Sequence, residues 1–439
     1  VVEGHAGLVK CLLPVRAQEH AGQWNQFRGS ELDGICSQPL PVRWDETTHV
    51  AWKSPIPGKG WSSPVVWEDQ VWVTTALEKE KELKAICVDL HSGQFCKEIT
   101  VFTPDTFYRK HSVNSYATPT PAIEAGFLYV HFGRYGTACL NTTTGQRVWE
   151  RTDLRCDHVQ GPGSSVILHG DKLIVHMEGT DVQYITALDK QTGETIWRTD
   201  RPQELYEPLE EIGRKAYVTP LIISVNGKDL LISNGSAVCI AYDVETGREV
   251  WRIIQGEDST IAMPVECDGW VYFYTSFVTG ENGKKYAELF AVDPEGRGDI
   301  GNTHIRWRIQ SPILQLSTPV AMDGKLYTVN SQSTLQCIDA RSGKVLWEER
   351  LRGKFHSSPI YASGLLYFSS TRGETIVCRA GDSYEEVSHN RLEGEIWATP
   401  AVAEGSILMR TSTCLYRIKD PESAHRRPSE ELPASQVQD

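Results

Sequence analysis

The chain has 439 residues and a formal net charge of −13, with 44 Lys and Arg against 57 Asp and Glu. This charge disfavours a general nucleic-acid or anionic-membrane binder, because both require a positive field. Hydrophobic residues make up 40 % and charged residues 23 %, which argues against global disorder. No apolar run approaches the roughly 20 residues needed to span a bilayer. The 13 Trp and 11 Cys residues indicate either chemistry or a repeated structural position.

The two ends differ from the rest of the chain. We interpret residues 1–23 as a leader remnant or a disordered segment, since Pro14–Gln18 resembles the end of a secretory leader. Lys10 directly before Cys11 disfavours a lipid-attachment cysteine. Residues 421–439 are rich in Pro, Ser, Glu and Arg, which predicts a disordered tail. Residues 24–420 are expected to form a single domain.

One phrase recurs through this domain. It is a small or polar residue, followed by Pro in seven of the eight copies, and then an apolar run, a turn and a second apolar run, as in SPVVWEDQVWVTT from Ser63. Apolar runs around a Gly, Asp or Asn turn predict a β-hairpin. The proline fits the first residue of a strand. The anchors recur about every 48 residues, at positions 64, 121, 166, 220, 264, 319, 359 and 400.

A second phrase follows most of the hairpins, and it is clean from Asp189 to Trp197 and from Asp243 to Trp251. It predicts a third strand, a tight Asp-x-x-Thr-Gly turn and a fourth strand that carries Trp. The Asp bonds to the turn backbone, and the Gly supplies a left-handed position. Eight copies of such a four-stranded antiparallel unit predict an all-β fold, an eight-bladed β-propeller.

The ends of this domain indicate how the ring closes. The last copy has three expected strands, Ala398–Val402, Ser406–Thr411 and Cys414–Lys419. The N-terminal segment His49–Pro55 is a Trp strand without a preceding hairpin. We expect this N-terminal strand to complete the eighth blade, which removes an open sheet edge.

Six of the 13 Trp and five of the 11 Cys residues fall on repeat positions. The fourth-strand tryptophans are interpreted as structural docking residues between blades: Trp52, Trp149, Trp197, Trp251, Trp307 and Trp347. Five cysteines alternate with Ala at the start of the third-strand phrase, which indicates buried, unpaired thiols: Cys87, Cys139, Cys337, Cys378 and Cys414. A disulfide stays open for the others: Cys11, Cys36, Cys96, Cys156, Cys239 and Cys267.

On these motifs the chain resembles the PQQ-like (pyrroloquinoline-quinone-like) β-propeller repeat family, whose hallmark is the Asp-x-x-Thr-Gly-x-x-x-Trp turn. The segments WNQFRG (Trp24–Gly29) and VAWKSPIPGKGWSSP (Val50–Pro64) are similar to exported bacterial members. The likeness covers about Trp24–Lys419 and implies the fold more strongly than the function. One branch of the family is the PQQ- and Ca²⁺-dependent quinoprotein alcohol dehydrogenases. Another is the propeller lipoprotein of the outer-membrane β-barrel assembly machinery, a scaffold without cofactor.

The dehydrogenase branch carries an adjacent Cys-Cys pair beside its quinone, and this chain has no vicinal cysteines. No Ca²⁺ ligand or catalytic Asp matches a motif position, so no catalytic, cofactor-binding or metal-binding residue is assigned, and PQQ and Ca²⁺ are disfavoured. We therefore expect a non-catalytic, monomeric scaffold for protein or envelope partners, exported to the periplasm or cell surface. A PQQ-dependent oxidoreductase and a glycan-binding propeller are the alternatives.

Three other patterns have mainly structural interpretations. The segment Gly296–Gly301 fits GxGxxG but lies in a propeller turn rather than between a strand and a helix. The consecutive residues Cys156–His158 do not readily converge on one metal ion. A solvated insertion loop, or a contact to a basic partner, accounts for four carboxylates: Glu204, Glu207, Glu210 and Glu211.

The candidate binding face is formed by residues that precede the repeat anchors. In a propeller the innermost strand begins near the central channel, so we expect these side chains to meet there. Such a funnel suits a sugar, a peptide or a small aromatic molecule; alternatively, the side chains only fill and cap the channel. They are Trp61, His111, Asn114, Tyr116, His158, Tyr217, Gln315, His356 and Trp397.

Overall fold

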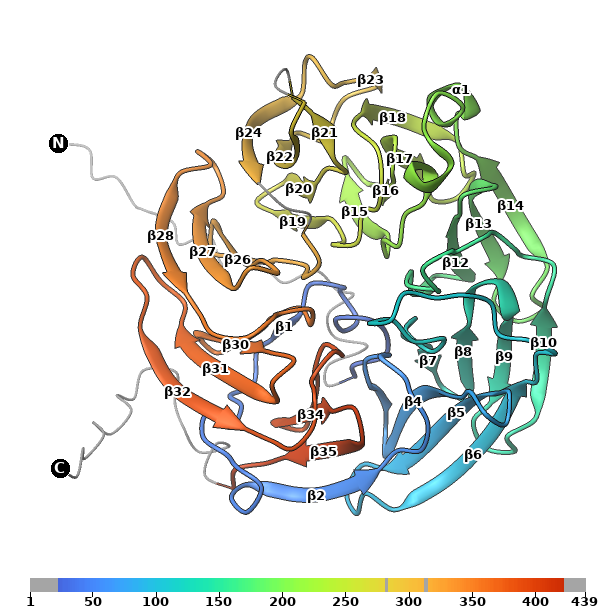
Figure 1. The fold of residues 1–439 in the computed structure, drawn as a ribbon, viewed down its shortest axis with the longest axis vertical. Coiled ribbons are helices and arrows are strands. Elements are labelled where there is room, and N and C mark those ends of the chain that lie inside the picture. The colour runs from blue at the N-terminus through green and yellow to red at the C-terminus, as the bar shows by residue number, and fades with distance from the viewer. Residues whose placement is uncertain (1–22, 281–282, 312–314, 422–439) are drawn as a thin grey trace, which may run out of the picture.

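The structure is a computed structural model that describes residues 23–280, 283–311 and 315–421. Eight antiparallel sheets are arranged around a central axis, in chain order around the ring (Figure 1). The predicted eight-bladed β-propeller is therefore confirmed. In the described part of the chain no helix is both long and apolar enough to cross a membrane. The expected leader and tail, with Cys11, lie outside the described residues apart from Gln23 and Pro421.

The first four blades each consist of four consecutive strands. Blade 1 contains β3 (Val65–Trp67), β4 (Gln70–Leu77), β5 (Glu82–Asp89) and β6 (Phe95–Phe102). Blade 2 contains β7 (Ala122–Glu124), β8 (Phe127–His131), β9 (Thr137–Asn141) and β10 (Arg147–Arg151). Blade 3 contains β11 (Ile167–His169), β12 (Lys172–Glu178), β13 (Gln183–Asp189) and β14 (Thr195–Asp200). Blade 4 contains β15 (Leu221–Val225), β16 (Lys228–Asn234), β17 (Val238–Asp243) and β18 (Glu249–Ile254).

The second half of the ring repeats this plan. Blade 5 contains β19 (Val265–Cys267), β20 (Trp270–Tyr274), β22 (Lys285–Val292) and β24 (Ile305–Ser311), with the short β21 (Val278–Thr279). Blade 6 contains β25 (Val320–Met322), β26 (Lys325–Val329), β27 (Thr334–Asp339) and β28 (Val345–Arg350). Blade 7 contains β29 (Ile360–Ala362), β30 (Leu365–Ser369), β31 (Glu374–Arg379) and β32 (Glu386–Arg391). Blade 8 contains β33 (Ala401–Ala403), β34 (Ser406–Arg410), β35 (Cys414–Ile418) and β2 (Val50–Pro55).

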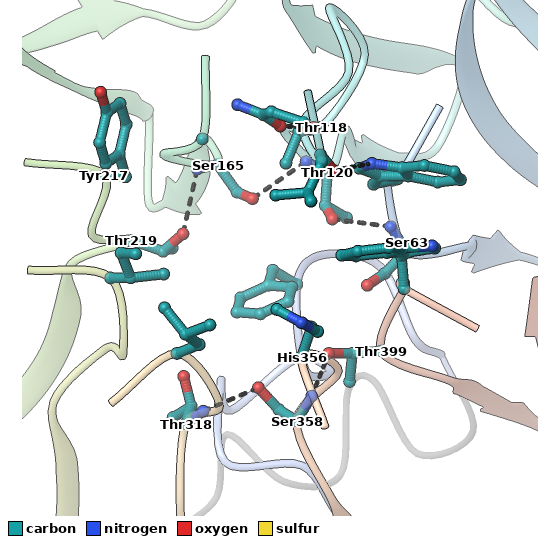
Figure 2. A pocket seen from close by; sticks show the side chains of 18 of the residues that line it. Ser63, Thr118, Thr120, Ser165, Tyr217, Thr219, Thr318, His356, Ser358 and Thr399 are labelled. Atoms are coloured by element: carbon teal, nitrogen blue, oxygen red, sulfur yellow. Dashed lines mark hydrogen bonds between the residues drawn. The ribbon is translucent and has the colours of Figure 1, made fainter. Parts of the chain in front are cut away.

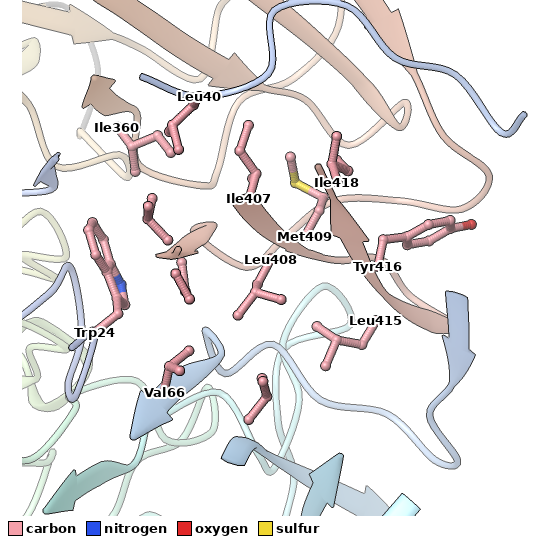
Figure 3. Packing of buried hydrophobic residues seen from close by; sticks show 14 of the residues in the cluster. Trp24, Leu40, Val66, Ile360, Ile407, Leu408, Met409, Leu415, Tyr416 and Ile418 are labelled. Carbon is pink, nitrogen blue, oxygen red and sulfur yellow. The ribbon is translucent and has the colours of Figure 1, made fainter. Parts of the chain in front are cut away.

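Ring closure takes place in blade 8, as the sequence predicts. Strand β2 pairs antiparallel with β35, with Trp52 opposite Arg417 and Pro55 opposite Cys414. The same region is sealed by a hydrophobic cluster in which Trp24 and Leu40 of the N-terminal segment pack with Val66 of blade 1 and Ile407 of blade 8 (Figure 3). Because the two ends of the domain share one blade and one core, β35 is covered by β2 and is not left as the outer edge strand of blade 8.

The docking role of the fourth-strand tryptophans is visible in their contacts. Each donates its indole N–H to a backbone carbonyl in the next blade, at 2.8–3.0 Å. Trp149 packs where a Cβ on Gly193 would lie, within 2.6 Å of its ring, and Trp197 packs in the same way against Gly247. The Trp of one blade thus packs on the Thr-Gly turn of the next blade. Glycine is needed there because a side chain would clash with the Trp ring and because the turn requires a positive φ.

The third-strand cysteines are buried and free, as expected. In one blade, however, the predicted position of the cysteine along the third strand is wrong. In blades 2 and 6 the docking Trp pairs with Cys139 and Cys337. In blade 8 the position opposite Trp52 is Arg417, three residues after Cys414. Arg417 donates to the Leu90 carbonyl at 2.8 Å, the carbonyl that also accepts the Trp52 indole N–H. The other described cysteines are free thiols as well: Cys36, Cys96, Cys156, Cys239 and Cys267.

Three further details differ from the expectations. The seven prolines immediately precede the first strands rather than starting them, as Pro64 does before β3. The Gly296–Gly301 turn contributes β23 (Gly298–Asp299), a strand that pairs parallel with β18 and extends blade 4. The insertion after blade 3 contains two short helical turns, α1 (Gln203–Tyr206) and a 3-10 turn at Glu211–Arg214, in place of a plain loop. A second 3-10 turn, Gly133–Tyr135, lies in blade 2.

Candidate functional site

The residues that precede the innermost strands form a belt of hydrogen bonds around the axis (Figure 2). The backbone N–H of Ser63 donates to Thr120 Oγ1 at 2.9 Å, that of Thr120 to Ser165 Oγ at 2.9 Å, and that of Ser165 to Thr219 Oγ1 at 3.0 Å. Each bond joins one blade to the next. The same kind of link, at 2.9–3.1 Å, continues on the other side through Met263, Thr318, Ser358 and Thr399.

This belt explains the small hydroxyl residue of the first repeat phrase. A buried backbone N–H must find an acceptor, and the side chain of the next blade supplies it. Met263 donates into the belt but has no hydroxyl to accept a bond. Of the eight residues that directly precede the anchors, Met263 alone is neither Ser nor Thr. The belt bonds form two arcs, one from Ser63 to Thr219 and one from Met263 to Thr399.

A cavity of about 630 Å³ lies inside the belt, at the centre of the ring. Besides the hydroxyl residues it is lined by aromatic and apolar side chains, among them Phe27, Tyr217 and Leu316. Its volume is within the range typical of small-ligand pockets. Among the described residues that line it, none is Asp, Glu or Cys, and the fixed cation is Lys354.

The N-terminal segment Trp24–Arg28 occupies the channel on one side of this cavity. The backbone carbonyl of Trp24 accepts from Val66 N, and that of Asn25 accepts from Ile123 N, both at 2.8 Å. Val66 and Ile123 are the second residues of β3 and β7, so the segment lies further along the innermost strands than the hydroxyl belt does. Phe27 of this segment lines the cavity, which therefore lies between the segment and the loops that lead into the strands.

A buried arginine fixes the far end of the segment. The Arg28 guanidinium is fully buried and donates to the carbonyls of Pro319 at 2.8 Å and Pro359 at 3.2 Å, in blades 6 and 7. Strand β1 (Ile35–Cys36) then pairs parallel with β29. Burial lowers the pKa of Arg28 to about 10, so it remains a cation at neutral pH. In the sequence, WNQFRG indicates only a family likeness, whereas in the structure this segment bridges the ring.

The open side of the cavity carries an aromatic mouth. The Trp61 and Trp397 rings stack with centroids 5.4 Å apart, and His356 lies 4.6 Å from Trp397. Trp61 donates its indole N–H to the Val113 carbonyl at 2.9 Å, and Trp397 donates to Glu395 Oε2 at 3.1 Å. Both indoles are thus held in place. They come from the loops before blades 1 and 8, which are neighbours because the ring is closed.

Six of the nine sequence-predicted residues line the cavity, and they come from blades that are far apart in the chain. The six are Trp61, His111, Asn114, Tyr217, His356 and Trp397. Burial, followed by the nearby Lys354, lowers the pKa of His356 to about 4, so this imidazole is neutral at pH 7. The side-chain amide of Asn114 donates to the carbonyls of Gln160 at 2.8 Å and Pro162 at 3.1 Å. It therefore joins two of the entry loops, by which we mean the loops that lead into the innermost strands.

The other three residues lie outside the cavity. Tyr116 is buried beneath blades 1 and 2, with its ring stacked 4.2 Å from Phe107. His158 is buried with Nε2 at 3.1 Å from Cys156 Sγ. Gln315 is buried and donates to the Val329 carbonyl at 2.6 Å. The expectation that every one of these residues reaches the channel is therefore wrong for these three, whose side chains turn back into the blades.

Several lining residues carried no sequence signal. Phe27 reaches the cavity from the N-terminal segment, and Gln160 and Lys354 come from entry loops without a distinctive motif. Thr118 and Leu316 each lie two positions before a hydroxyl residue of the first phrase, Thr120 and Thr318, so this fixed spacing could have identified them.

The lining does not match the chemistry of a quinone–calcium site. Ca²⁺ takes oxygen ligands, most of them carboxylates, and the described lining contains no carboxylate. In the described part of the chain, no group of three or more His, Cys, Asp or Glu side chains is placed to hold a metal ion. Cys156 and His158 do contact each other, but Asp157 instead pairs with Arg134 at 3.1 Å.

A family model described as outer membrane protein assembly factor BamB matches residues 108–297 and 285–382, which together are more than half of the chain. The chain belongs to this family. The BamB-family match covers blades 2 to 6 and part of blade 7, the region in which the Asp-x-x-Thr-Gly turn and its Trp are most regular.

Two curated relatives are similar to parts of this BamB-family chain. Tetrathionate hydrolase of Acidithiobacillus ferrooxidans is 20 % identical over 313 residues, 68 % of this chain and 51 % of that protein. The dehydrogenase subunit of the quinone alcohol dehydrogenase of Komagataeibacter europaeus is 24 % identical over 152 residues, 29 % of this chain and 21 % of that protein. The chain therefore spans about half the length of the first relative and less of the second.

Two solved structures share the fold. BamB from Moraxella catarrhalis is 11 % identical with a TM-score of 0.56, and the match covers 84 % of this chain and 99 % of that one. Quinohemoprotein alcohol dehydrogenase from Comamonas testosteroni is 12 % identical with a TM-score of 0.67, and the match covers 91 % and 81 % of the two chains. At these identities the likeness shows the propeller fold alone.

Proposed function

We propose that this chain is a non-catalytic binding scaffold of the cell envelope, and that it binds a protein partner at the mouth of the central cavity. The observation that carries the proposal is the stacked pair Trp61 and Trp397 above a cavity lined by hydroxyl and apolar side chains. Trp and Tyr side chains dominate the binding energy of protein interfaces when they sit in well-packed pockets. Both indoles are partly exposed and held by hydrogen bonds, so little ordering is needed on binding.

The cavity supports this reading over a quinoprotein oxidoreductase. A quinone–calcium centre needs carboxylate ligands, and the described lining offers none. No vicinal cysteine pair occurs in the sequence. Membership of the outer membrane protein assembly factor BamB family is consistent with an exported protein that works with other envelope proteins.

The aromatic mouth is less suited to a glycan. Sugars stack on free aromatic faces, but Trp397 is already in ring contact with both Trp61 and His356. The Lys59 ammonium lies over the Trp61 ring, 5.2 Å from its centroid. Part of each indole face is therefore covered before any ligand arrives. A broad glycan array that shows no binding would agree with this, and binding lost on Trp61→Ala would instead favour a glycan ligand.

The main alternative can be tested by reconstitution. The full chain is titrated with PQQ and excess Ca²⁺, and dye reduction is followed with alcohols and sugars as substrates. We expect no quinone-dependent reduction above a buffer control. Dye reduction that requires both PQQ and the protein would overturn the scaffold proposal.

The scaffold role itself can be tested by quantitative capture from an envelope extract of the source cells. We expect one or a few proteins to be retained by the parent chain and lost with Trp397→Ala. Trp270→Ala is a matched control, because Trp270 starts β20 in blade 5 and does not line the cavity. Thermal unfolding of both variants establishes that they are folded.

A further inference from the structure

A side groove adjoins the central cavity on its open face. Its volume is about 740 Å³, and it shares His111 and Gln160 with the cavity. The groove is formed by the entry loops of blades 2 and 3, and Ile212 of the blade 3 insertion contributes to it. A ligand that occupies the cavity mouth can therefore continue into the groove without leaving the protein surface.

Three basic side chains, Arg109, Lys110 and Arg134, line the groove, although the net charge of the whole chain is −13. Arg109 is exposed and makes no ion pair with any described residue. The Arg134 guanidinium lies 3.6 Å from the Tyr108 ring centroid and pairs with Asp157 at 3.1 Å. Lys110 pairs with Glu78 at 3.2 Å. Two of the three cations are thus partly neutralised, and Arg109 retains its full charge.

A fourth cation lies between the groove and the aromatic mouth. The Lys59 ammonium is 3.4 Å from the Ser112 carbonyl, and Ser112 lines the groove. Burial and the nearby Lys110 lower the pKa of Lys59, whereas the carboxylates of Glu78 and Glu395 act in the opposite direction. The positive field therefore extends from Arg109 to the edge of the stacked indoles.

Exposed apolar side chains flank these cations. Tyr108 is 50 %, Val113 45 % and Ile212 51 % exposed, which is unusual for such residues. Val113 lines the cavity, and the other two line the groove. Arg and aromatic side chains together are the composition enriched in protein-interface cores.

We propose that the side groove binds an extended acidic peptide segment of the partner, with one aromatic or large apolar side chain of that segment in the central cavity. This inference rests on the proposed scaffold function and names the chemistry of the partner. The guanidinium of Arg109 recognises a carboxylate through paired N–H groups. Elsewhere the acidic surface repels such a segment, so the groove fixes where it docks.

The experiment uses three fluorescein-labelled peptides and the full chain. The first is Gly-Glu-Asp-Phe-Glu-Asp-Gly, the second replaces every acidic residue by Lys, and the third replaces Phe by Ala. Fluorescence polarisation is measured at low and at physiological salt. We expect the acidic peptide to bind at least about tenfold more tightly than the lysine peptide, and to weaken as salt rises. The alanine peptide should bind about tenfold more weakly than the first, because it leaves the cavity empty.

Two variants locate the site. Arg109→Glu should weaken the acidic peptide by about tenfold or more, because it reverses the one unpaired charge of the groove. Arg297→Glu is the matched control: Arg297 is an exposed arginine in the outer turn of blade 5, and it should leave binding unchanged. Equal binding of the acidic and lysine peptides, no measurable binding of either, or equal effects of the two variants would overturn the inference.

Failure of this inference can be separated from failure of the scaffold role. If the acidic peptide shows no preference while Trp397→Ala still abolishes capture of the envelope partner, the scaffold proposal stands and the acidic-peptide inference fails. If capture does not depend on Trp397, or if PQQ-dependent turnover is found, the scaffold proposal itself fails.

Discussion

The indole N–H of Trp197 in blade 3 donates to the backbone carbonyl of Val244 in blade 4, at 2.9 Å. Val244 follows the Asp of the turn in blade 4, and Gly247 of that turn lies under the Trp197 ring. One blade's last strand is thus fixed on the next blade's last turn. Equivalent contacts recur around the ring. Each blade is therefore stabilised by its neighbour through the same pair of residues, a docking Trp and the turn Gly of the next blade.

This contact predicts that two glycines of the same blade differ in their tolerance of alanine. Gly247→Ala places a Cβ 2.5 Å from Trp197 Cε3 at a φ of +66°, whereas at Gly227, with a φ of +76°, nothing lies within 4 Å of the added atom. Gly227→Ala should cost about 1 kcal/mol of unfolding free energy from strain alone. Gly247→Ala should cost about 2 kcal/mol more, because the indole must move. Equal losses in urea denaturation would contradict the docking account.

The hydroxyl belt predicts a loss from a substitution that conserves shape. Thr120→Val removes the acceptor for the Ser63 N–H while filling the same space, so a buried donor is left without a partner. The expected loss is about 1–3 kcal/mol. Thr143→Val, at an exposed position in the blade 2 turn, should stay within about 0.5 kcal/mol of the parent. Chemical denaturation of both variants provides the comparison, and a neutral Thr120→Val would argue against the belt.

A buried ion pair of blade 3, at the junction with blade 4, predicts a larger effect. Glu178 contacts Arg201 Nε at 2.8 Å and accepts from Tyr206 at 2.8 Å, and both Glu178 and Arg201 are fully buried. Burial alone would raise the pKa of Glu178, but Arg201 and the other donors outweigh it and hold that pKa below its usual range. Glu178→Gln should cost about 3–5 kcal/mol by leaving a buried guanidinium unpaired.

The matched control for this pair is a surface carboxylate. Asp200 bonds to Arg198 at 2.8 Å, but both side chains are well exposed. Asp200→Asn should therefore change the unfolding free energy by less than about 1 kcal/mol. If Glu178→Gln lies in the same small range in urea denaturation, the buried pair does not stabilise the junction as argued.

Two buried histidines predict acid sensitivity. Burial lowers the pKa of His131 to about 3 and that of His158 to about 4, against about 6.5 in an unfolded chain. Between pH 6.5 and about 4 the unfolded state binds protons that the native state does not. Each histidine should therefore lower the unfolding free energy by about 1.4 kcal/mol per pH unit as pH falls through this range, with no contribution above about pH 7.

The double variant His131→Gln with His158→Gln tests this slope. Its unfolding free energy should depend less on pH between 4.5 and 6.5 than that of the parent. Burial raises the pKa of Asp33 to about 6, so Asp33 acts with the opposite sign in this range. Comparing variant with parent isolates the histidines. Identical pH slopes in denaturant titrations would show that these imidazoles are not held neutral.

The blades and their closure could be predicted because their signals are local. The Asp189–Trp197 and Asp243–Trp251 phrases encode a turn and the strand that follows it, and each recurs with the same spacing. The predicted register of Cys414 was wrong because β35 ends at Ile418 and is not followed by the Thr-Gly turn that fixes the alignment elsewhere. Where the turn is missing, a small apolar residue alone does not identify the strand position.

The candidate site was harder to predict, because its contacts join distant parts of the chain. Arg28 binds carbonyls of Pro319 and Pro359, and no periodicity in the N-terminal segment indicates this. Tyr116 and His158 share the entry loops with His111 and Asn114, yet they turn into the blades. Which side chain of a loop faces the channel depends on packing between blades, and a single sequence does not reveal it.

Site-specific photo-crosslinking tests most directly whether a partner protein docks at the mouth of the cavity. A benzoylphenylalanine is placed at Val113, which is 45 % exposed at the mouth, or at Val345, which is 38 % exposed on the last strand of blade 6. Each chain is irradiated in an envelope extract of the source cells. We predict a discrete crosslinked protein from position 113 that disappears with Trp397→Ala, and none from position 345. Crosslinks of equal yield at both positions, or a position-113 crosslink that is indifferent to Trp397→Ala, would contradict the account.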